Sequence, residues 1–331
     1  MGVSWFEPWY HAHVGLIVAA VLALFGAWMA SISRIKGRAE PGRASFIFAE
    51  VMMILYMVYL AMVVAGDMLF LKQSKLYNSE MEIDGDWWGE VKRSMEKGLI
   101  VQTIGLVCSI IANALLLFSL VELGNGLMFM LKQQRSKSQK IMRYFALSVA
   151  AVMFILQLAI IPLMHKFFPI TWIPFGDDGE LDDDVDADSL FNEMNKGLWT
   201  ISQLNLTYDV LNLVTAIAVL VYASVVMHAY RNVKSTRGCA IAFLTMAILF
   251  FTRAMWLFVY RVTFHYHTSY YILPIEAELM LDVFLNYWLY TAILLTLFFL
   301  ALKKQGGIWT TEQPWMRTKK SLPSVEENRS W

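Results

Sequence analysis

The sequence contains few charged residues and almost no cysteine. Of its 331 residues 16% are charged, whereas 58% are hydrophobic. Its 27 basic residues balance its 27 acidic residues, so no general attraction to nucleic acid is expected. Cys108 and Cys239 are the only two cysteines, and both lie in or beside apolar runs. We therefore expect no structural disulfide, no metal site and no cofactor.

The chain also has no segment between apolar runs that is long enough for a separate soluble domain. Seven apolar runs are each long enough to cross a bilayer as a helix. This pattern predicts an all-α, polytopic membrane protein, a seven-transmembrane bundle over residues 1–304 with a tail at 305–331. The predicted helices cover residues 13–33, 45–71, 98–131, 141–164, 204–230, 239–264 and 274–302.

The connections between the runs alternate in charge. The first, third and fifth connections are basic, whereas the second and fourth are acidic or mixed. Because lysine and arginine are enriched in short cytoplasmic loops, we expect an N-outside, C-inside topology with no cleaved signal. The expected location is the plasma membrane or the endoplasmic reticulum. The basic connections contain Arg34, Lys36, Arg38 and Arg43, then Lys132, Arg135, Lys137, Lys140 and Arg143, then Arg231, Lys234 and Arg237.

The last apolar run carries acidic residues near its start. Glu278, Asp282 and Asn286 stand at positions i, i+4 and i+8, on one face of a helix. A charged side chain at the centre of a bilayer costs about 2.5–3.5 kcal/mol on insertion scales. This face is therefore expected to point into a protein interior or a wet cavity.

Other apolar runs repeat the pattern, with polar side chains mostly in the predicted outer half. We interpret these side chains as the lining of a cavity that binds a lipophilic small molecule. In the alternative interpretation Arg253 pairs with Asp282 or Asp209 only to hold the helices together, and Asp282 is the expected partner. The predicted ligand-binding residues are Asp67, Gln102, Asn113, Asp209, Asn212, Arg253, Tyr260, Glu278, Asp282 and Asn286. Aromatic residues that line the cavity or face lipid are Trp256, Tyr260, Tyr270, Tyr271, Tyr287 and Trp288.

Three further sequence patterns are typical of sites. For the first two, which could bind metal, an explanation without a metal is favoured. Asp182–Asp186 reads Asp-Asp-x-x-Asp, which can hold Mg²⁺ on a diphosphate, but it stands alone in a predicted outer loop. His265 and His267 lack a third metal ligand. Asn205 begins an Asn-Leu-Thr triplet on the predicted outer side, which makes it a candidate glycosylation site close to the membrane.

The seven-helix, N-outside arrangement resembles the broad receptor class, but the sequence motifs of that class are missing. Residues 130–135 contain no Asp/Glu-Arg-Tyr, residues 285–290 contain no Asn-Pro-x-x-Tyr, and no lysine precedes Lys303 in the seventh run, which excludes a retinal Schiff base there. Arg253, the pair Tyr260-Arg261, Glu278 and Asp282 resemble the end of fungal seven-transmembrane proteins of the lipid-translocating-exporter-like or orphan receptor-like kind. The resemblance covers the last third of the chain. It implies handling of a lipophilic compound at the membrane.

Three functions remain open at this point. A sensor or binding protein for a lipophilic molecule, in contact with membrane lipid, is favoured. The first alternative is a membrane-embedded terpene cyclase of a fungal secondary-metabolite pathway, in which Asp282 or Asp209 supplies the proton. The second alternative is a lipid or metabolite exporter, which the lack of an internal repeat weakens.

Overall fold

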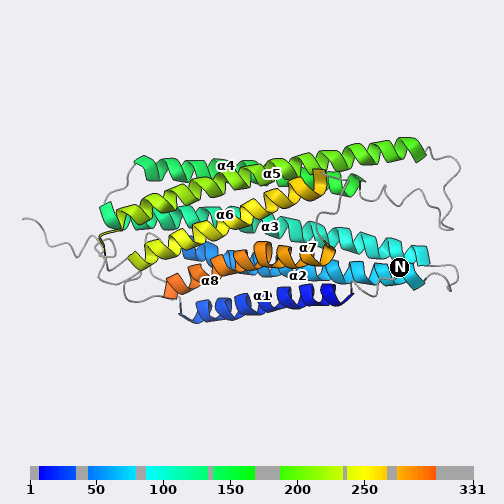
Figure 1. The fold of residues 1–331 in the computed structure, drawn as a ribbon, viewed down its shortest axis with the longest axis horizontal. Helices are drawn as coiled ribbons and strands as arrows, with labels where there is room; N and C mark the ends of the chain where they lie inside the picture. Colours follow the sequence, from blue (N-terminus) through cyan, green and yellow to red (C-terminus); the bar gives the residue numbers. More distant parts are fainter. Residues whose placement is uncertain are drawn as a thin grey trace, which may run out of the picture.

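The computed structural model describes residues 7–34, 44–79, 87–132, 137–167, 187–233, 237–266 and 274–302. Every regular element in these ranges is a helix, as the sequence predicts (Figure 1). The predicted tail at 305–331 lies outside the described residues. The helices are α1 Glu7–Arg34, α2 Ala44–Ser79, α3 Trp87–Lys132, α4 Lys137–Phe167, α5 Ala187–Ala229, α6 Arg237–Tyr266, α7 Ile275–Asp282, the π-helical η4 Val283–Trp288 and α8 Leu289–Leu302.

Seven of the described helical segments are long and apolar enough to cross a membrane, and α7, η4 and α8 together form the seventh. The predicted seven-helix, multi-pass architecture is confirmed in this respect, whereas the orientation stays a prediction. Several helices extend beyond their predicted ends, and the largest extensions are at the starts of α3, at Trp87, and of α5, at Ala187. Hydropathy marks the part of a helix that lies in hydrocarbon, whereas backbone hydrogen bonding continues into the polar flanks.

The helices run roughly along the long axis of the bundle (Figure 1). Each of the helices α1 to α5 packs against the next helix in the chain, α6 packs against η4 and α8, and α8 closes the bundle by also contacting α1 and α2. The interior contains large apolar and aromatic side chains such as Tyr56, Leu116 and Phe243. Large apolar side chains such as Leu22 and Ile155 are exposed on the outside. This exposure suits a bundle surrounded by lipid.

A glycine of α3 permits close packing at the end of the bundle where α8 ends. A Cβ added to Gly124 would lie 2.5 Å from Cε1 of Tyr222 and 2.9 Å from Cζ of Phe243. Small residues let transmembrane helices approach one another in this way. Beside it, the Tyr222 hydroxyl donates to Oδ1 of Asn125 at 2.9 Å. The α3, α5 and α6 helices are therefore held at this end by close packing and a hydrogen bond.

The seventh segment is not a uniform α-helix, because η4 forms a π-helical turn over Val283–Trp288. The predicted helix over 274–302 is confirmed as one continuous segment, but its π-helical turn was not predicted. The wider turn buries both Asn286 and Tyr287. Single π-helical turns occur frequently at functional sites. Polar side chains gather beside it, towards the end of the bundle where α7 begins, which we term the α7 end.

Candidate functional site

Arg253 of α6 is the most buried basic side chain of this region, at 3% exposure. Its Nε donates to Oδ1 of Asn286 at 3.0 Å, and its Nη1 donates to Oδ1 of Asn113 at 3.1 Å. The guanidinium carbon lies 4.8 Å from the centre of the Tyr290 ring. The expected ion pair of Arg253 with Asp282 is therefore wrong. Two amide oxygens and an aromatic ring face, rather than a carboxylate, stabilise the buried cation.

Asn113 of α3 extends this network to α5. Its Nδ2 donates to the Tyr208 hydroxyl at 3.1 Å and to Oγ of Ser109 at 3.4 Å. The amide thus accepts from Arg253 through its oxygen and donates through its nitrogen. As a result α3, α5 and α6 are joined through one half-buried asparagine, and Arg253 extends the network to Asn286 of η4.

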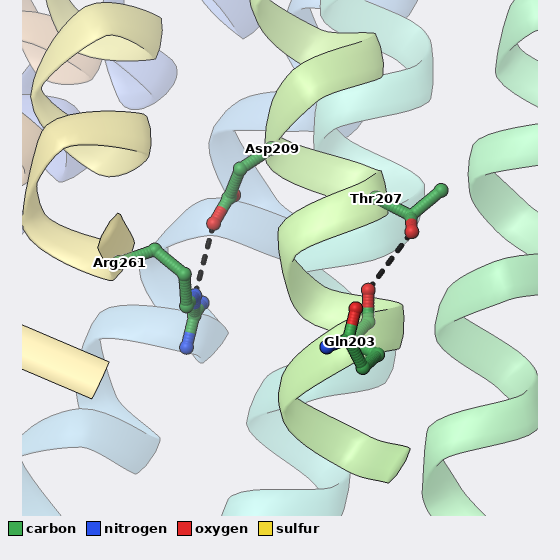
Figure 2. Close-up of polar contacts among 4 residues, drawn as sticks. All are labelled: Gln203, Thr207, Asp209 and Arg261. Carbon is green, nitrogen blue, oxygen red and sulfur yellow. Dashed lines mark hydrogen bonds and ion pairs between the residues drawn. The ribbon is translucent and has the colours of Figure 1, made fainter. Parts of the chain in front are cut away.

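The buried ion pair of α6 is instead formed by Arg261. Its Nε lies 3.0 Å from Oδ2 of Asp209 on α5, whose side chain is 3% exposed (Figure 2). Thr207 lies on another face of α5 and bonds only within its own helix, donating to the carbonyl oxygen of Gln203 at 2.8 Å (Figure 2). Arg261 was not among the predicted ligand-binding residues. Its position two turns beyond Arg253 was the available signal.

The α6 and α7 helices are connected by two further hydrogen bonds. The Trp256 Nε1 donates to Oδ1 of Asp282 at 3.2 Å. The Tyr260 hydroxyl donates to Oε1 of Glu278 at 2.6 Å. The donors stand at i and i+4 on α6, and the acceptors stand at the same spacing on the neighbouring helix. Each carboxylate thus meets a neutral aromatic donor.

A histidine that the sequence analysis missed contributes from α1. Nδ1 of His13 lies 3.0 Å from Oδ2 of Asp67 on α2, without the alignment of a hydrogen bond. The His13 ring also meets the Tyr287 ring edge-on, with the centroids 6.2 Å apart. Because His13 stands at the start of the first apolar run, hydropathy alone did not mark it as an interior residue.

Tyrosines of α2 and of the seventh segment pack against one another in this region. Tyr56 of α2 stacks on Tyr290 with ring centroids 4.1 Å apart, and its hydroxyl donates to the Tyr287 carbonyl oxygen at 3.1 Å. Tyr59 lies against Tyr287 at a centroid distance of 6.1 Å. Of the aromatic residues for which both a cavity and a lipid location were open, Tyr287 is buried inside the bundle. Tyr56 and Tyr59 were missed because they lie in an otherwise apolar run.

Not every predicted site residue joins this cluster. Gln102 is exposed on α3 and makes no hydrogen bond with the other site residues in the described ranges. Asn205 is half-buried within α5, in a stretch apolar enough to span the membrane. The Asp182–Asp186 motif, His267, Tyr270 and Tyr271 lie outside the described residues. Within the described ranges no three histidine, cysteine or acidic side chains gather as a metal site would require.

Asn212 is buried beside the Arg253 network and lines a small cavity of about 10 Å³. Asn113, Tyr208 and Thr215 supply the other polar lining groups. A volume of this size is at the lower limit for one water molecule. The cavity is too small for any organic ligand, so it does not itself form the predicted ligand site.

The chain was compared with models of protein families, with curated proteins and with solved structures, and none of the three comparisons found a match.

Proposed function

We propose that the protein binds a lipophilic small molecule with a polar end, at the α7 end of the bundle between α6 and α7. The observation that carries this proposal is the state of Glu278 and Asp282. Both carboxylates are hydrogen-bonded to neutral aromatic side chains, and neither has an ion-pair partner among the described residues. Two carboxylates at this depth without a basic partner are available to a ligand.

A purely structural role explains this arrangement less well. A charge at the centre of a bilayer costs about 2.5–3.5 kcal/mol on insertion scales. Measured hydrogen bonds between transmembrane helices average only about 0.6 kcal/mol. Glu278 and Asp282 stand two and six residues into the spanning stretch Glu276–Ala301, so the cost of each lies below this central value. The hydrogen bonds to α6 offset that cost only in part. Ionisable residues inside a membrane are by default indicators of function.

The neighbouring side chains suit a ligand that is mostly apolar. Trp256 and Tyr260 present ring surfaces beside the carboxylates, and a few polar groups in apolar walls are typical of small-molecule sites. In the predicted orientation this site belongs to the outer half of the membrane. The ligand would enter from the lipid or from outside the cell, which fits a sensing role.

Photoaffinity labelling of the purified protein tests this proposal. The probes are an alkyne-tagged, photoreactive isoprenoid alcohol and an alkyne-tagged, photoreactive sphingoid amine, each competed with its untagged parent. We expect saturable labelling that maps to α6 and α7 and falls at least about tenfold in Asp282→Asn, since a lost charged hydrogen bond is worth about 1.5–3 kcal/mol.

Thr252→Ala is the matched control, because Thr252 is an exposed α6 residue whose hydroxyl bonds only to the Ile248 carbonyl of its own helix. It should label like the wild type. Labelling that does not saturate, or that maps only to exposed side chains for both probes, would contradict the proposal.

A proton-initiated terpene cyclase is the second candidate, and the surroundings of Asp282 favour it. Trp256 donates a hydrogen bond to this carboxylate, and Tyr59 and Tyr287 are near enough to interact with it electrostatically. Such a reaction requires a carboxylic acid that donates a proton to the substrate. It also requires aromatic rings around the substrate, because ring faces stabilise the developing cation.

Incubation of membranes with linear isoprenoids separates the two candidates. A cyclase would release cyclised products of unchanged mass from wild type and none from Asp282→Asn, which keeps the shape of the side chain. Such products would replace the binding proposal with the enzymatic one. Binding without products, lost in Asp282→Asn, would support the binding proposal.

A further inference from the structure

The outward side of the α2–α3 pair forms a groove of about 610 Å³ that is separate from the carboxylates of α7. Apart from two lysines, every residue that lines it is apolar. Its lining residues are Ala65, Met68, Leu69 and Lys72 of α2, and Lys97, Ile100 and Val101 of α3. Met68 and Ile100 are 42% and 56% exposed, so the groove is open to the surrounding lipid.

Both lysines lie at the same end of the groove. Lys72 stands towards the C-terminus of α2 and Lys97 towards the N-terminus of α3, and these two helices are consecutive, adjacent and antiparallel (Figure 1). Ala65 lies two helical turns before Lys72, about 10 Å along the helix axis. The apolar floor therefore extends from the two ammonium groups towards the middle of the bundle.

Among the described side chains beside the groove, basic residues outnumber acidic ones, whereas the sequence of the connection at 80–86 contains four acidic residues. Among the exposed side chains of α3 near the groove, Lys92, Arg93 and Lys97 are basic and Glu96 is acidic. Lys72 ends an apolar stretch that spans Ile47–Gln73, so it stands at the level of the lipid headgroups. The predicted topology places this end outside the cell, where the positive-inside rule does not account for these lysines.

We propose that this groove binds an anionic phospholipid of the surrounding bilayer. Its phosphate lies between the ammonium groups of Lys72 and Lys97, and one acyl chain lies along Ala65, Leu69 and Val101. Lysine binds phosphate as a point charge, and Lys72 stands at the level where lipid headgroups lie. A soluble phosphate ion would gain nothing from the apolar floor, so the lining favours the lipid.

Binding to the full-length protein in a non-ionic detergent tests this site independently of Asp282. The probes are dioctanoyl phosphatidic acid, dioctanoyl phosphatidylcholine and glycerol 3-phosphate, which supply the anionic lipid, a zwitterionic lipid and the headgroup alone. We expect phosphatidic acid to bind tightest. Its Kd should rise about 30-fold in Lys72→Gln/Lys97→Gln, since each lysine near a bilayer surface contributes about fivefold.

Lys137→Gln/Lys196→Gln removes two charges from exposed lysines of α4 and α5 and serves as the matched control. It should leave the Kd within about twofold of the wild-type value. Ala65→Trp fills the groove and keeps both lysines, so it should also weaken phosphatidic acid binding. Should the double glutamine variant not fold, Lys72→Gln alone, with an expected change of about fivefold, decides the question.

Three results would overturn the proposal. An equal loss of affinity in the control variant would show a diffuse attraction of lipid to the whole surface. Glycerol 3-phosphate that binds as tightly as phosphatidic acid would show a site for soluble anions. Phosphatidylcholine that binds as tightly would show that the two lysines do not recognise net negative charge.

Discussion

The Arg253 contacts predict a specific pattern of energetic coupling. In the structure this guanidinium bonds to Asn286 and Asn113, and it forms no hydrogen bond or ion pair with Asp282. Arg253→Ala leaves both amide oxygens without their donor, and each unsatisfied buried group costs about 1–3 kcal/mol. Loss of the Tyr290 ring contact adds about 0.5–2 kcal/mol. We expect Arg253→Ala to lower the free energy of unfolding by about 3 kcal/mol, because the removed desolvation cost of the charge offsets part of these losses.

Two double-mutant cycles test this pattern. The free energy of unfolding is measured in mixed micelles for Arg253→Ala, Asn286→Ala and Asp282→Ala, and for the two double variants that contain Arg253→Ala. The cycle with Asn286 should give a coupling of at least about 1 kcal/mol, whereas the cycle with Asp282 should be additive within about 0.5 kcal/mol. A larger coupling to Asp282 than to Asn286 would refute the reasoning.

Three other predictions concern the helix contacts and the topology. Asp209→Ala should lower the free energy of unfolding by about 2–3 kcal/mol, below the usual value for a buried pair because Arg261 is 22% exposed, and Arg261→Ala in that background should cost little more. Gly124→Ala should destabilise by about 1–3 kcal/mol in the same assay, because its Cβ would meet Tyr222, whereas Gly126→Ala, with nothing within 4 Å, should not. A C-terminal tag should resist protease in intact cells and be cleaved once the plasma membrane is opened; cleavage in sealed cells would contradict the predicted orientation.

Hydropathy and charge were sufficient to predict the seven helices and the acidic face of the seventh. Residues such as Glu278 and Asp282 are conspicuous because carboxylates are rare in hydrocarbon. Their interior location follows from the free-energy cost of exposing a charged side chain to lipid. The partner of Arg253 did not follow from the same argument. Sequence places a residue at a depth in the membrane, but its partner depends on the rotation of each helix about its axis. The π-helical turn at η4 changes the direction in which Asn286 points from the helix axis, and no residue pattern predicts this turn.

The aromatic part of the site was hidden for a different reason. Tyr56 and Tyr59 have the hydropathy of their apolar surroundings, so a pattern of polar residues does not include them. His13 stands at the predicted start of the first helix, where lipid headgroups and protein interior are equally plausible surroundings. Only packing of α1 and α2 against η4 brings these rings together with Tyr287.

Native mass spectrometry of the protein released directly from cell membranes tests ligand binding between α6 and α7 most directly. The wild type should carry a bound lipophilic molecule at up to one copy per chain, and the exposed control Thr252→Ala should carry the same mass. Asp282→Asn and Glu278→Gln, checked for correct folding by size exclusion, should lose that mass. If both variants retain it at the wild-type level, the carboxylates of α7 do not hold a ligand and the proposed function is wrong.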